Sequence, residues 1–301
     1  MSEKKKARIS RREKALIRTK NKLSSPWATA ISIIIAVLWT IPTVGLLVTS
    51  FRQNRLAIST SGWWTSLLPK NWSDFGLANY KTVLGGTYNL GAYLTNSFVI
   101  TIPGVLIPIS LALLAAYAFA WCDFPGKNIL FIAVFSLQVV PVQVAMIPLL
   151  TQYVNWGINN TFWVIWLTHT IFGLPLAIFM LHNFMCDIPR ELIEAARVDG
   201  AGDVQIFLKV VLPLMVPATA SFAIFQFLWV WNDLLVALAF TGNTASTAPL
   251  TARLSDMVGS RGSAWYLLAP GAFIAMIVPV LVFLFLQRYF VRGMLAGAVK
   301  G

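Results

Sequence analysis

Long stretches without any Asp, Glu, Lys or Arg constrain the fold of this chain more than any other feature. They occupy residues 23–51, 82–122, 128–186, 210–232 and 262–287. A membrane-spanning helix needs about 20 apolar residues, so each stretch can cross a bilayer once, and 128–186 can cross twice. Only 11% of the 301 residues are charged and 57% are hydrophobic, whereas a soluble domain carries about 25% charged residues. The sequence therefore predicts an all-α integral membrane protein.

Six membrane spans are expected. We place them at 27–51, 95–121, 129–153, 162–184, 211–240 and 265–288, with a turn at 155–160 between the third and the fourth. A cleaved signal peptide is the alternative for the first, but its apolar run is about twice the usual length and an anchor helix fits better. Every span contains or begins near a proline. Each proline within a helix releases a backbone carbonyl that a neighbouring helix or water must satisfy.

The distribution of basic residues predicts the orientation in the membrane. With the N-terminus in the cytoplasm, segments 1–26, 122–128, 185–210 and 288–301 lie inside and hold 17 of the 23 Lys and Arg residues. The outer segments, 52–94 and 241–264, hold the other six. By the positive-inside rule, both termini are expected in the cytoplasm.

Residues 1–26 form a basic cytoplasmic tail, and 27–301 the membrane domain. The tail is interpreted as a topology signal, with binding to anionic lipid as the alternative. A nucleic-acid partner is not indicated, because the charge is confined to one arm without an aromatic platform.

Catalytic and metal-binding patterns are absent from the sequence. No glycine-rich phosphate loop ending in Lys-Ser/Thr occurs, so ATP hydrolysis is not expected of this chain. His182 and Cys186 are four residues apart, but with His169 they do not form a recognisable zinc pattern. No Gly-x-Ser-x-Gly turn for a nucleophile is present. The sequence predicts no enzyme, no metal site and no cofactor held by this chain.

The inside loop 187–210 contains a short predicted helix. Pro189 suits a first helical turn and Gly200 suits the position after the helix end. The apolar side chains of Leu192, Ile193 and Ala196 are expected on one face. On the other face, Glu194 can pair with Arg190 or Arg197. Periodicity alone favours a surface helix that merely connects two spans.

The same loop resembles the EAA signature of the permease subunits of bacterial ABC importers. The resemblance rests on Glu194-Ala195-Ala196, Gly200, Val210 and Leu212-Pro213, with Val210 where the family prefers isoleucine. Residues 188–192, 231–233 and 287–301 are similar to the carbohydrate branch, and the match covers 27–301. Among that branch, the second permease of maltose-type importers is most similar. The outer stretch 250–263 resembles the α-glucoside or glucosylglycerol relatives.

The resemblance implies a type I permease fold, a location in the bacterial plasma membrane and a set of partners. These would be a homologous second permease, two ATPase subunits that bind ATP and Mg, and an extracytoplasmic sugar-binding protein. It also implies that the loop helix couples to the ATPase, through Glu191, Glu194, Ala195, Ala196, Arg197, Asp199 and Gly200. The ending would reach between the ATPase subunits through Gly297, Ala298, Val299, Lys300 and Gly301.

Four residues of the fifth span are candidates for a sugar path: Gln226, Trp229, Asn232 and Asp233. Asp233 is the one acidic residue within a span, and a charge in the bilayer must face protein or water. It either lines the path or hydrogen-bonds a partner helix.

The expected function is ATP-driven import of a sugar or sugar-derived solute, such as an oligosaccharide or an α-glucoside, by alternating access. An ion-coupled secondary transporter is the first alternative, and it would require ionisable residues within the membrane. A membrane enzyme or scaffold is the second. Neither alternative accounts for the loop motif.

Overall fold

The computed structural model describes residues 26–86, 88–242, 244–258 and 265–298. In these residues the chain is helical, and one isolated antiparallel bridge joins Arg52 to Phe75. The chain divides into two compact units, Met1–Gly76 and Leu77–Gly301. The predicted basic tail falls on residues 1–25, which lie outside the described residues, and on Pro26, where the first helix begins.

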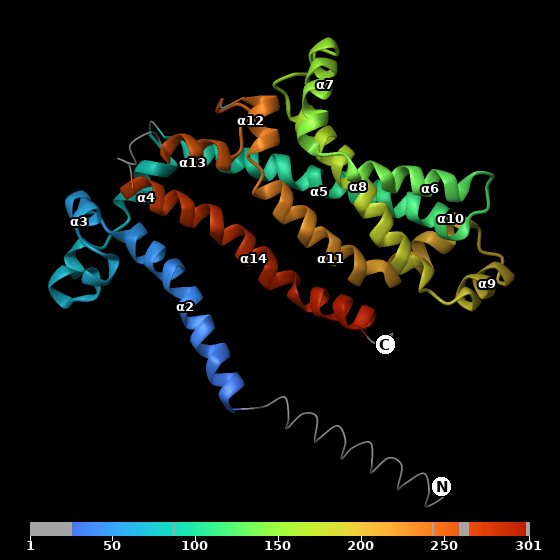
Figure 1. Cartoon of the computed structure of the whole chain (residues 1–301), viewed down its shortest axis with the longest axis horizontal. Helices are drawn as coiled ribbons and strands as arrows, with labels where there is room; N and C mark the ends of the chain where they lie inside the picture. The colour runs from blue at the N-terminus through green and yellow to red at the C-terminus, as the bar shows by residue number, and fades with distance from the viewer. Residues whose placement is uncertain (1–25, 87, 243, 259–264, 299–301) are drawn as a thin grey trace, which may run out of the picture. The chain divides into compact units, whose positions relative to one another are not determined.

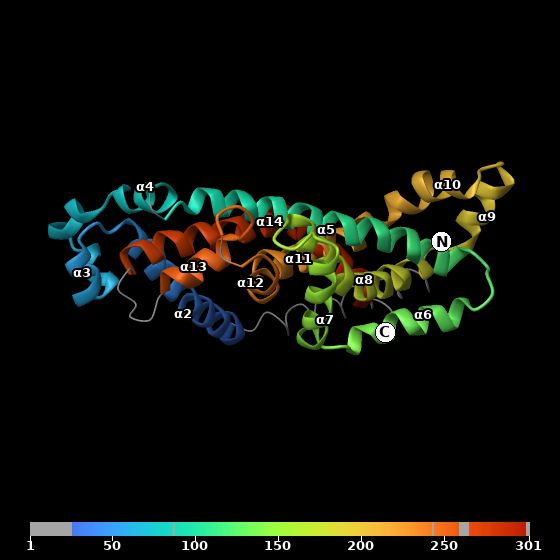
Figure 2. The same ribbon diagram turned by 90° about the horizontal axis from the view of Figure 1, so that it is seen from above.

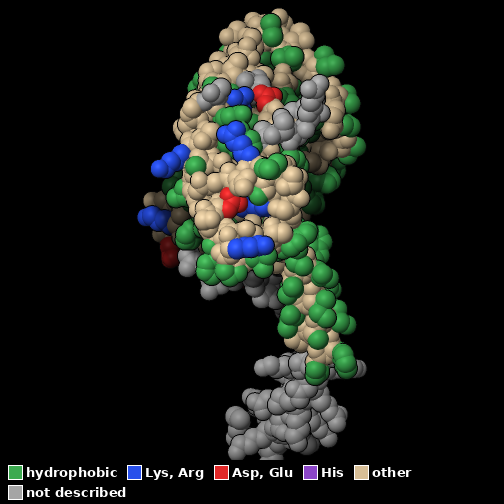
Figure 3. All heavy atoms as spheres, turned by 90° about the vertical axis from the view of Figure 1, so that its left-hand side faces the viewer, with side chains coloured by type: hydrophobic (Ala, Val, Ile, Leu, Met, Phe, Trp, Pro, Cys, Tyr) green, Lys and Arg blue, Asp and Glu red, His purple; other side chains and the backbone are tan. Residues whose placement is uncertain are grey.

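The first unit consists of a long apolar helix followed by a small folded segment. Helix α2 (Pro26–Phe51) corresponds to the predicted first span, and Figure 3 shows its surface covered by apolar side chains. The following elements are α3 (Arg55–Thr60) and the 3₁₀ turns η1 (Trp63–Leu67) and η2 (Pro69–Asp74). Arg52, only 2% exposed, ties them together. Its guanidinium lies 3.7 Å from the Asp74 carboxylate and donates to the Ser61 hydroxyl at 2.8 Å.

The second unit contains the remaining helices (Figures 1 and 2). They are α4 (Ala78–Leu84), α5 (Leu90–Trp121), α6 (Lys127–Ser136), η3 (Leu137–Val139), α7 (Val142–Asn155), α8 (Phe162–Cys186), α9 (Arg190–Val198), α10 (Asp203–Ile206), the π-turn η4 (Phe207–Val211), α11 (Leu212–Trp231), α12 (Leu235–Thr241), α13 (Leu250–Val258) and α14 (Trp265–Ala298). Helix α5 packs along α8 more extensively than any other helix pair, and α11 packs against α5, α8 and α14. The largest apolar core lies among α5, α8 and α11, with the α9–α10 segment closing one end.

Five of the described helical segments are long and apolar enough to cross a membrane. They are Pro26–Phe51, Leu90–Trp121, Phe162–Cys186, Asp203–Trp231 and Trp265–Gln287. They correspond to five of the expected spans, although the bounds of the fifth differ. The predicted turn at 155–160 is also present, with Gly157 and Asn160 at positive φ.

Two of the predicted spans need correction. The third, expected as one helix at 129–153, consists of Lys127–Val139 and Val142–Asn155, which meet at an angle of 100°. Pro141 cannot donate a backbone hydrogen bond and holds Val140 in an extended conformation, so the helix breaks there. The fifth, expected at 211–240, begins earlier, at Asp203, and is interrupted after Trp231, before α12.

Side chains from neighbouring helices satisfy carbonyl groups that prolines release. Pro103 and Pro108 lie inside α5 and leave the carbonyls of Val99 and Gly104 without their usual donors. The Trp166 indole of α8 donates to Val99 O at 2.9 Å. The Gln226 amide of α11 donates to Gly104 O at 3.0 Å.

Helix α14 repeats this arrangement. Pro279 releases the carbonyl of Ala275, and the buried Trp231 indole of α11 donates to it at 3.0 Å. The expectation that neighbouring helices satisfy proline-released carbonyls is confirmed at these three positions. The same bonds hold α5, α8, α11 and α14 in register.

We predict that Trp166→Phe destabilises the protein only while Pro103 is present. Removing the indole donor leaves Val99 O unsatisfied, at a cost of about 1 kcal/mol for an interhelical bond in a membrane. In a Pro103→Ala background the restored N–H of residue 103 satisfies that carbonyl, so the cost should largely vanish. A double-mutant cycle of unfolding free energies in detergent measures the coupling. Trp163→Phe is the control, because Trp163 is 59% exposed. Equal costs in both backgrounds would contradict the assignment.

The predicted orientation leads to a labelling experiment. Ser73 and Ser246 are exposed and belong to predicted outer segments, whereas the native Cys122 and Cys186 belong to predicted inner ones. In intact cells, an impermeant thiol reagent should therefore modify Ser73→Cys and Ser246→Cys but leave the wild-type cysteines unmodified. Modification of Cys186 from outside, or protection of Ser246→Cys, would contradict the six-span topology.

Candidate functional site

The α9 helix ends as its sequence predicts but begins one residue later. Pro189, expected in the first helical turn, precedes the helix as its N-cap residue (φ −57°, ψ 131°). Gly200 follows the helix in a left-handed conformation at φ +82°, so the predicted glycine end is confirmed. The Gly200 N–H donates to Arg197 O and the Ala201 N–H donates to Ala196 O, both at 3.0 Å. This pair of bonds is the Schellman motif, which satisfies the last carbonyls of the helix. The chain can then reverse toward α10 within a few residues.

One face of α9 is anchored in the protein and the other is free. Ile193 is 2% exposed and, with Ala196, packs against the core formed by α5, α8 and α11. Leu192, expected on the same face, is 46% exposed, a correction to the sequence prediction. The opposite face presents the exposed side chains of Glu191, Glu194, Ala195 and Val198. Packing of the buried face therefore leaves a mixed apolar and acidic face of α9 exposed.

The ion pairs of this segment differ from those expected. Arg197 Nη2 lies 3.3 Å from Asp203 Oδ1 in α10 instead of pairing with Glu194. Within the described residues Glu194 has no ion-pair partner, and its carboxylate is exposed. The Tyr117 hydroxyl of α5 also lies 3.4 Å from Asp203 Oδ1. Asp203 therefore joins α10 to both α9 and α5, and Arg197 is directed to Asp203 instead of Glu194.

A cavity of about 460 Å³ lies beside the break between α6 and α7. Its lining combines residues of the break, of α8 and of α11: Leu137, Gln138, Val139, Val140, Pro141, Val142, Ala145, Ile171, Phe172, Gly173, Pro175, Leu176, Gln226 and Trp229. None of these side chains is charged. Gln226 and Trp229 are among the residues predicted from the sequence, whereas Gln138 and Phe172 are not. A polar residue three positions before Pro141 was the available signal for Gln138.

Gln226 is both a lining residue and a structural bridge. Besides its bond to Gly104 O, its amide nitrogen lies 3.5 Å from His169 O in α8. Gly173 makes room for it, because a Cβ there would lie 2.8 Å from the amide. Trp229 is 37% exposed, and its ring meets the His169 ring edge to face with centroids 5.2 Å apart.

Asp233 lies at the break between α11 and α12, not in the cavity lining. Its carboxylate accepts the N–H groups of Val236 at 3.3 Å and Ala237 at 3.0 Å, and so caps α12. Its backbone carbonyl accepts the Thr251 hydroxyl at 2.6 Å. The buried His169 Nε2 lies 3.9 Å from Asp233 Oδ2. Capping of α12 thus gives the Asp233 carboxylate a structural role, and its sugar-path role stays a prediction.

Asn232 lies next to Asp233 and is exposed. Its side-chain amide donates to Leu228 O in the preceding turn at 2.8 Å. Like Asp233, Asn232 is separate from the residues that line the cavity. The four candidates for the sugar path therefore divide into two that line the cavity and two at the α11–α12 break.

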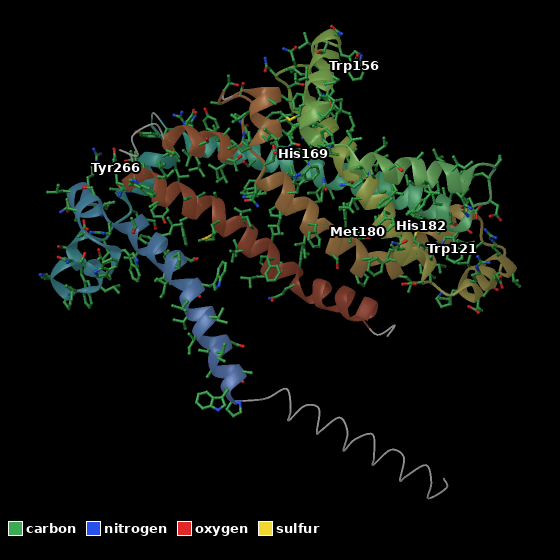
Figure 4. The ribbon with its side chains drawn as sticks, in the orientation of Figure 1. Trp121, Trp156, His169, Met180, His182 and Tyr266 are labelled. Atoms are coloured by element: carbon green, nitrogen blue, oxygen red, sulfur yellow. The ribbon has the colours of Figure 1, made fainter. Side chains whose placement is uncertain are left out.

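The two histidines of α8 are far apart along the helix. Figure 4 shows His169 in the middle of the helical bundle and His182 near the end that carries α9 and α10. Cys186 Sγ lies 3.5 Å from His182 Nε2. In the part of the chain that the structure describes, no group of three or more His, Cys, Asp and Glu residues is arranged to hold a metal ion.

Helix α14 continues through the predicted C-terminal tail as far as Ala298. Gly297 and Ala298 are its last helical residues. Val299, Lys300 and Gly301 lie outside the described residues. Contact of this tail with an ATPase subunit stays a prediction.

The sequence matches a known family of transport proteins. A profile of the binding-protein-dependent transport system inner membrane component matches residues 104–296. The chain belongs to this family. The permease is 54% identical over 267 residues to the osmoprotective compounds uptake permease protein GgtD of Synechocystis sp., covering 88% of this chain and 89% of that one.

Two further similarities support the same assignment. The permease is 52% identical over 232 residues to the alpha-glucoside transport system permease protein AglG of Rhizobium meliloti. That match covers 75% of this chain and 61% of the relative. The fold matches a chain of a bacterial ABC transporter involved in import of the acidic polysaccharide alginate, with a TM-score of 0.75 at 20% identity. The structural match covers 90% of this chain and 98% of the alginate transporter chain. The permease is a multi-pass inner-membrane protein of the ABC importer type.

Proposed function

We propose that this permease imports a sugar or sugar-derived solute by alternating access, driven by ATP hydrolysis in two partner ATPase subunits. A homologous second permease and an extracytoplasmic sugar-binding protein complete the assembly. ATP and Mg bind to the ATPase subunits. The observation that carries the proposal is α9, a helix fixed to the membrane core by Ile193 and presenting Glu191, Glu194, Ala195 and Val198 outward.

The geometry of α9 suits the transfer of motion. A helix whose buried face is packed into the core moves with that core, and its exposed face is then available to a partner. Val198 is 87% exposed and Leu192 is 46% exposed, so contact with a partner would remove apolar surface from water. Glu194 supplies a carboxylate for a basic group. Nucleotide bound to the ATPase would bias the permease between its two states through this contact.

The cavity supports an uncharged solute. Its lining offers the amides of Gln138 and Gln226 and the rings of Phe172 and Trp229, without any charged side chain. A carboxylate buried there would lack a cationic partner and would be strongly disfavoured. Sugar hydroxyls can instead bond to the amides while a ring face packs on Trp229. The relatives named for osmoprotective compounds and for α-glucosides are consistent with this class.

A secondary transporter is the competing function that one observation favours. His169 and Asp233 place two ionisable groups 3.9 Å apart at the membrane-spanning helices, as ion coupling would require. Uptake into vesicles distinguishes the two functions. The proposed importer needs ATP and the ATPase subunits, whereas ion-driven uptake without them would contradict the proposal.

We predict that Gly200→Val disrupts coupling far more than Gly200→Asn or Glu194→Ala. The positive φ of Gly200 costs a residue with a side chain about 1–2 kcal/mol, whereas Asn tolerates this conformation better. The Glu194 contact is an exposed pair worth about 0–1 kcal/mol. Sugar uptake and co-purification of the ATPase subunits are measured for each variant. Normal uptake with fully bound ATPase in Gly200→Val would contradict the coupling role. Equal loss in Gly200→Asn would indicate a steric clash with the partner instead of strain.

We predict that Trp229→Ala reduces the apparent affinity of uptake about tenfold, corresponding to about 1.4 kcal/mol, whereas Trp229→Phe retains most of it. The reason is that Ala removes the ring face on which the sugar packs. The probe is the sugar that the purified binding protein retains, identified by mass spectrometry. Trp163→Ala, which lies outside the cavity on α8, is the matched control. Unchanged uptake by Trp229→Ala would contradict the proposal that the sugar passes through this cavity.

A further inference from the structure

Helix α5 makes polar side-chain contacts to both a predicted outer segment and the cytoplasmic coupling loop. Figures 1 and 2 show α13 beside its first turns and α10 beside its last turns. The contact residues at the two ends, Asn96 and Tyr117, are separated by about 32 Å at 1.5 Å per residue. This is close to the thickness of the hydrocarbon core of a bilayer, about 30 Å. This separation matches the predicted topology, in which the two contacted segments belong to opposite sides of the membrane.

At the outer end, two buried side chains of α5 hold the segment that leads into α13. The Asn96 amide donates to the carbonyls of Ala245 and Ala248, each at 3.0 Å. The Ser97 hydroxyl accepts the N–H of Leu250, the first residue of α13, at 2.8 Å. Asn96 is 8% exposed and Ser97 is 2% exposed. A displacement of segment 244–250 must therefore move α5 or break these bonds.

At the inner end, Tyr117 contacts the coupling loop in two ways. Its hydroxyl lies 3.4 Å from both the carbonyl and the carboxylate of Asp203. Its ring packs edge to face against Phe207 in the π-turn, with centroids 5.3 Å apart. Asp203 in turn holds Arg197 of α9 at 3.3 Å. Tyr117 therefore positions both α9 and the start of α11.

Between these ends α5 is continuous. It forms one helix from Leu90 to Trp121 despite Pro103 and Pro108, whereas the third and the fifth spans break. The bonds from Trp166 and Gln226 to its released carbonyls support it along its middle. A helix braced in this way shifts as one body. Displacement at one end is thus passed to the other.

We infer that α5 links displacement of the outer segment 244–250 to the coupling loop, with Asn96, Ser97 and Tyr117 as positioning residues. This inference rests on the proposed function, because it assumes a binding protein outside and an ATPase inside. It adds a defined route between the two sides and assigns a role to three buried side chains.

A double-mutant cycle between the ends of α5 tests the inference. The assembled transporter, reconstituted in lipid nanodiscs, is assayed for ATP hydrolysis with and without the binding protein as purified, carrying its retained sugar. Ser97→Ala and Tyr117→Phe each remove one hydroxyl and no bulk. Each should lower the stimulation by binding protein about fivefold, the lower end of measured allosteric couplings, with basal hydrolysis and subunit assembly unchanged.

The double variant should lose no more stimulation of ATP hydrolysis than the more strongly affected single variant, because both substitutions interrupt the same route. Thr95→Val is the matched control, because the Thr95 hydroxyl bonds only to Gly91 O within α5 and is exposed. Should Ser97→Ala fail to assemble, Asn96→Ala tests the same end. Wild-type stimulation in Tyr117→Phe, or losses that simply multiply in the double variant, would overturn the inference while leaving the importer function intact. A wild-type transporter that imports without ATP would overturn the proposed function itself.

Discussion

A backbone carbonyl inside a bilayer must find a hydrogen-bond donor, and the prolines of this permease repeatedly remove the donor it would otherwise have. At Val99, Gly104 and Ala275 the missing donor is replaced by a side chain from another helix: Trp166, Gln226 and Trp231. Each bond serves two purposes, because it repairs one helix and fixes a second against it. Lipid supplies little hydrophobic force between helices, so such bonds carry much of the specificity with which α5, α8, α11 and α14 assemble.

At Pro141 the helix is interrupted instead. Pro141 separates α6 from α7 by a bend of 100°, and the cavity lies beside that bend. Irregular backbone at membrane depth is tolerated where it lines a cavity. The three bridged carbonyls thus join helices of the frame, and the helix break at Pro141 lies beside the cavity. Gln226 contributes to the helix frame and to the cavity, because its amide bridges α5 to α8 and its side chain also lines the cavity.

The segment that contains α9 and α10 depends on the same frame. Ile193 fixes α9 to the apolar core, and Asp203 joins Arg197 to Tyr117 of α5. The outward face of α9 retains Glu194, whose carboxylate the described part of the chain leaves without an ion-pair partner. Asp233 follows a similar principle at the other break, where its carboxylate satisfies the first N–H groups of α12. In both places an acidic side chain organises a change in helix direction.

The sequence by itself determined the membrane class, the approximate positions of five of the spans and the approximate ends of α9. These depend on local properties: the apolar length of a stretch, the conformational freedom of Gly200 and the fixed geometry of Pro189. Only the tertiary structure decided which donor satisfies each proline-released carbonyl. It also decided that Leu192 is exposed, that Arg197 pairs with Asp203, and that Gln138 and Trp229 border one cavity. These features depend on contacts between helices distant in sequence, and a pattern along one helix does not specify its neighbour.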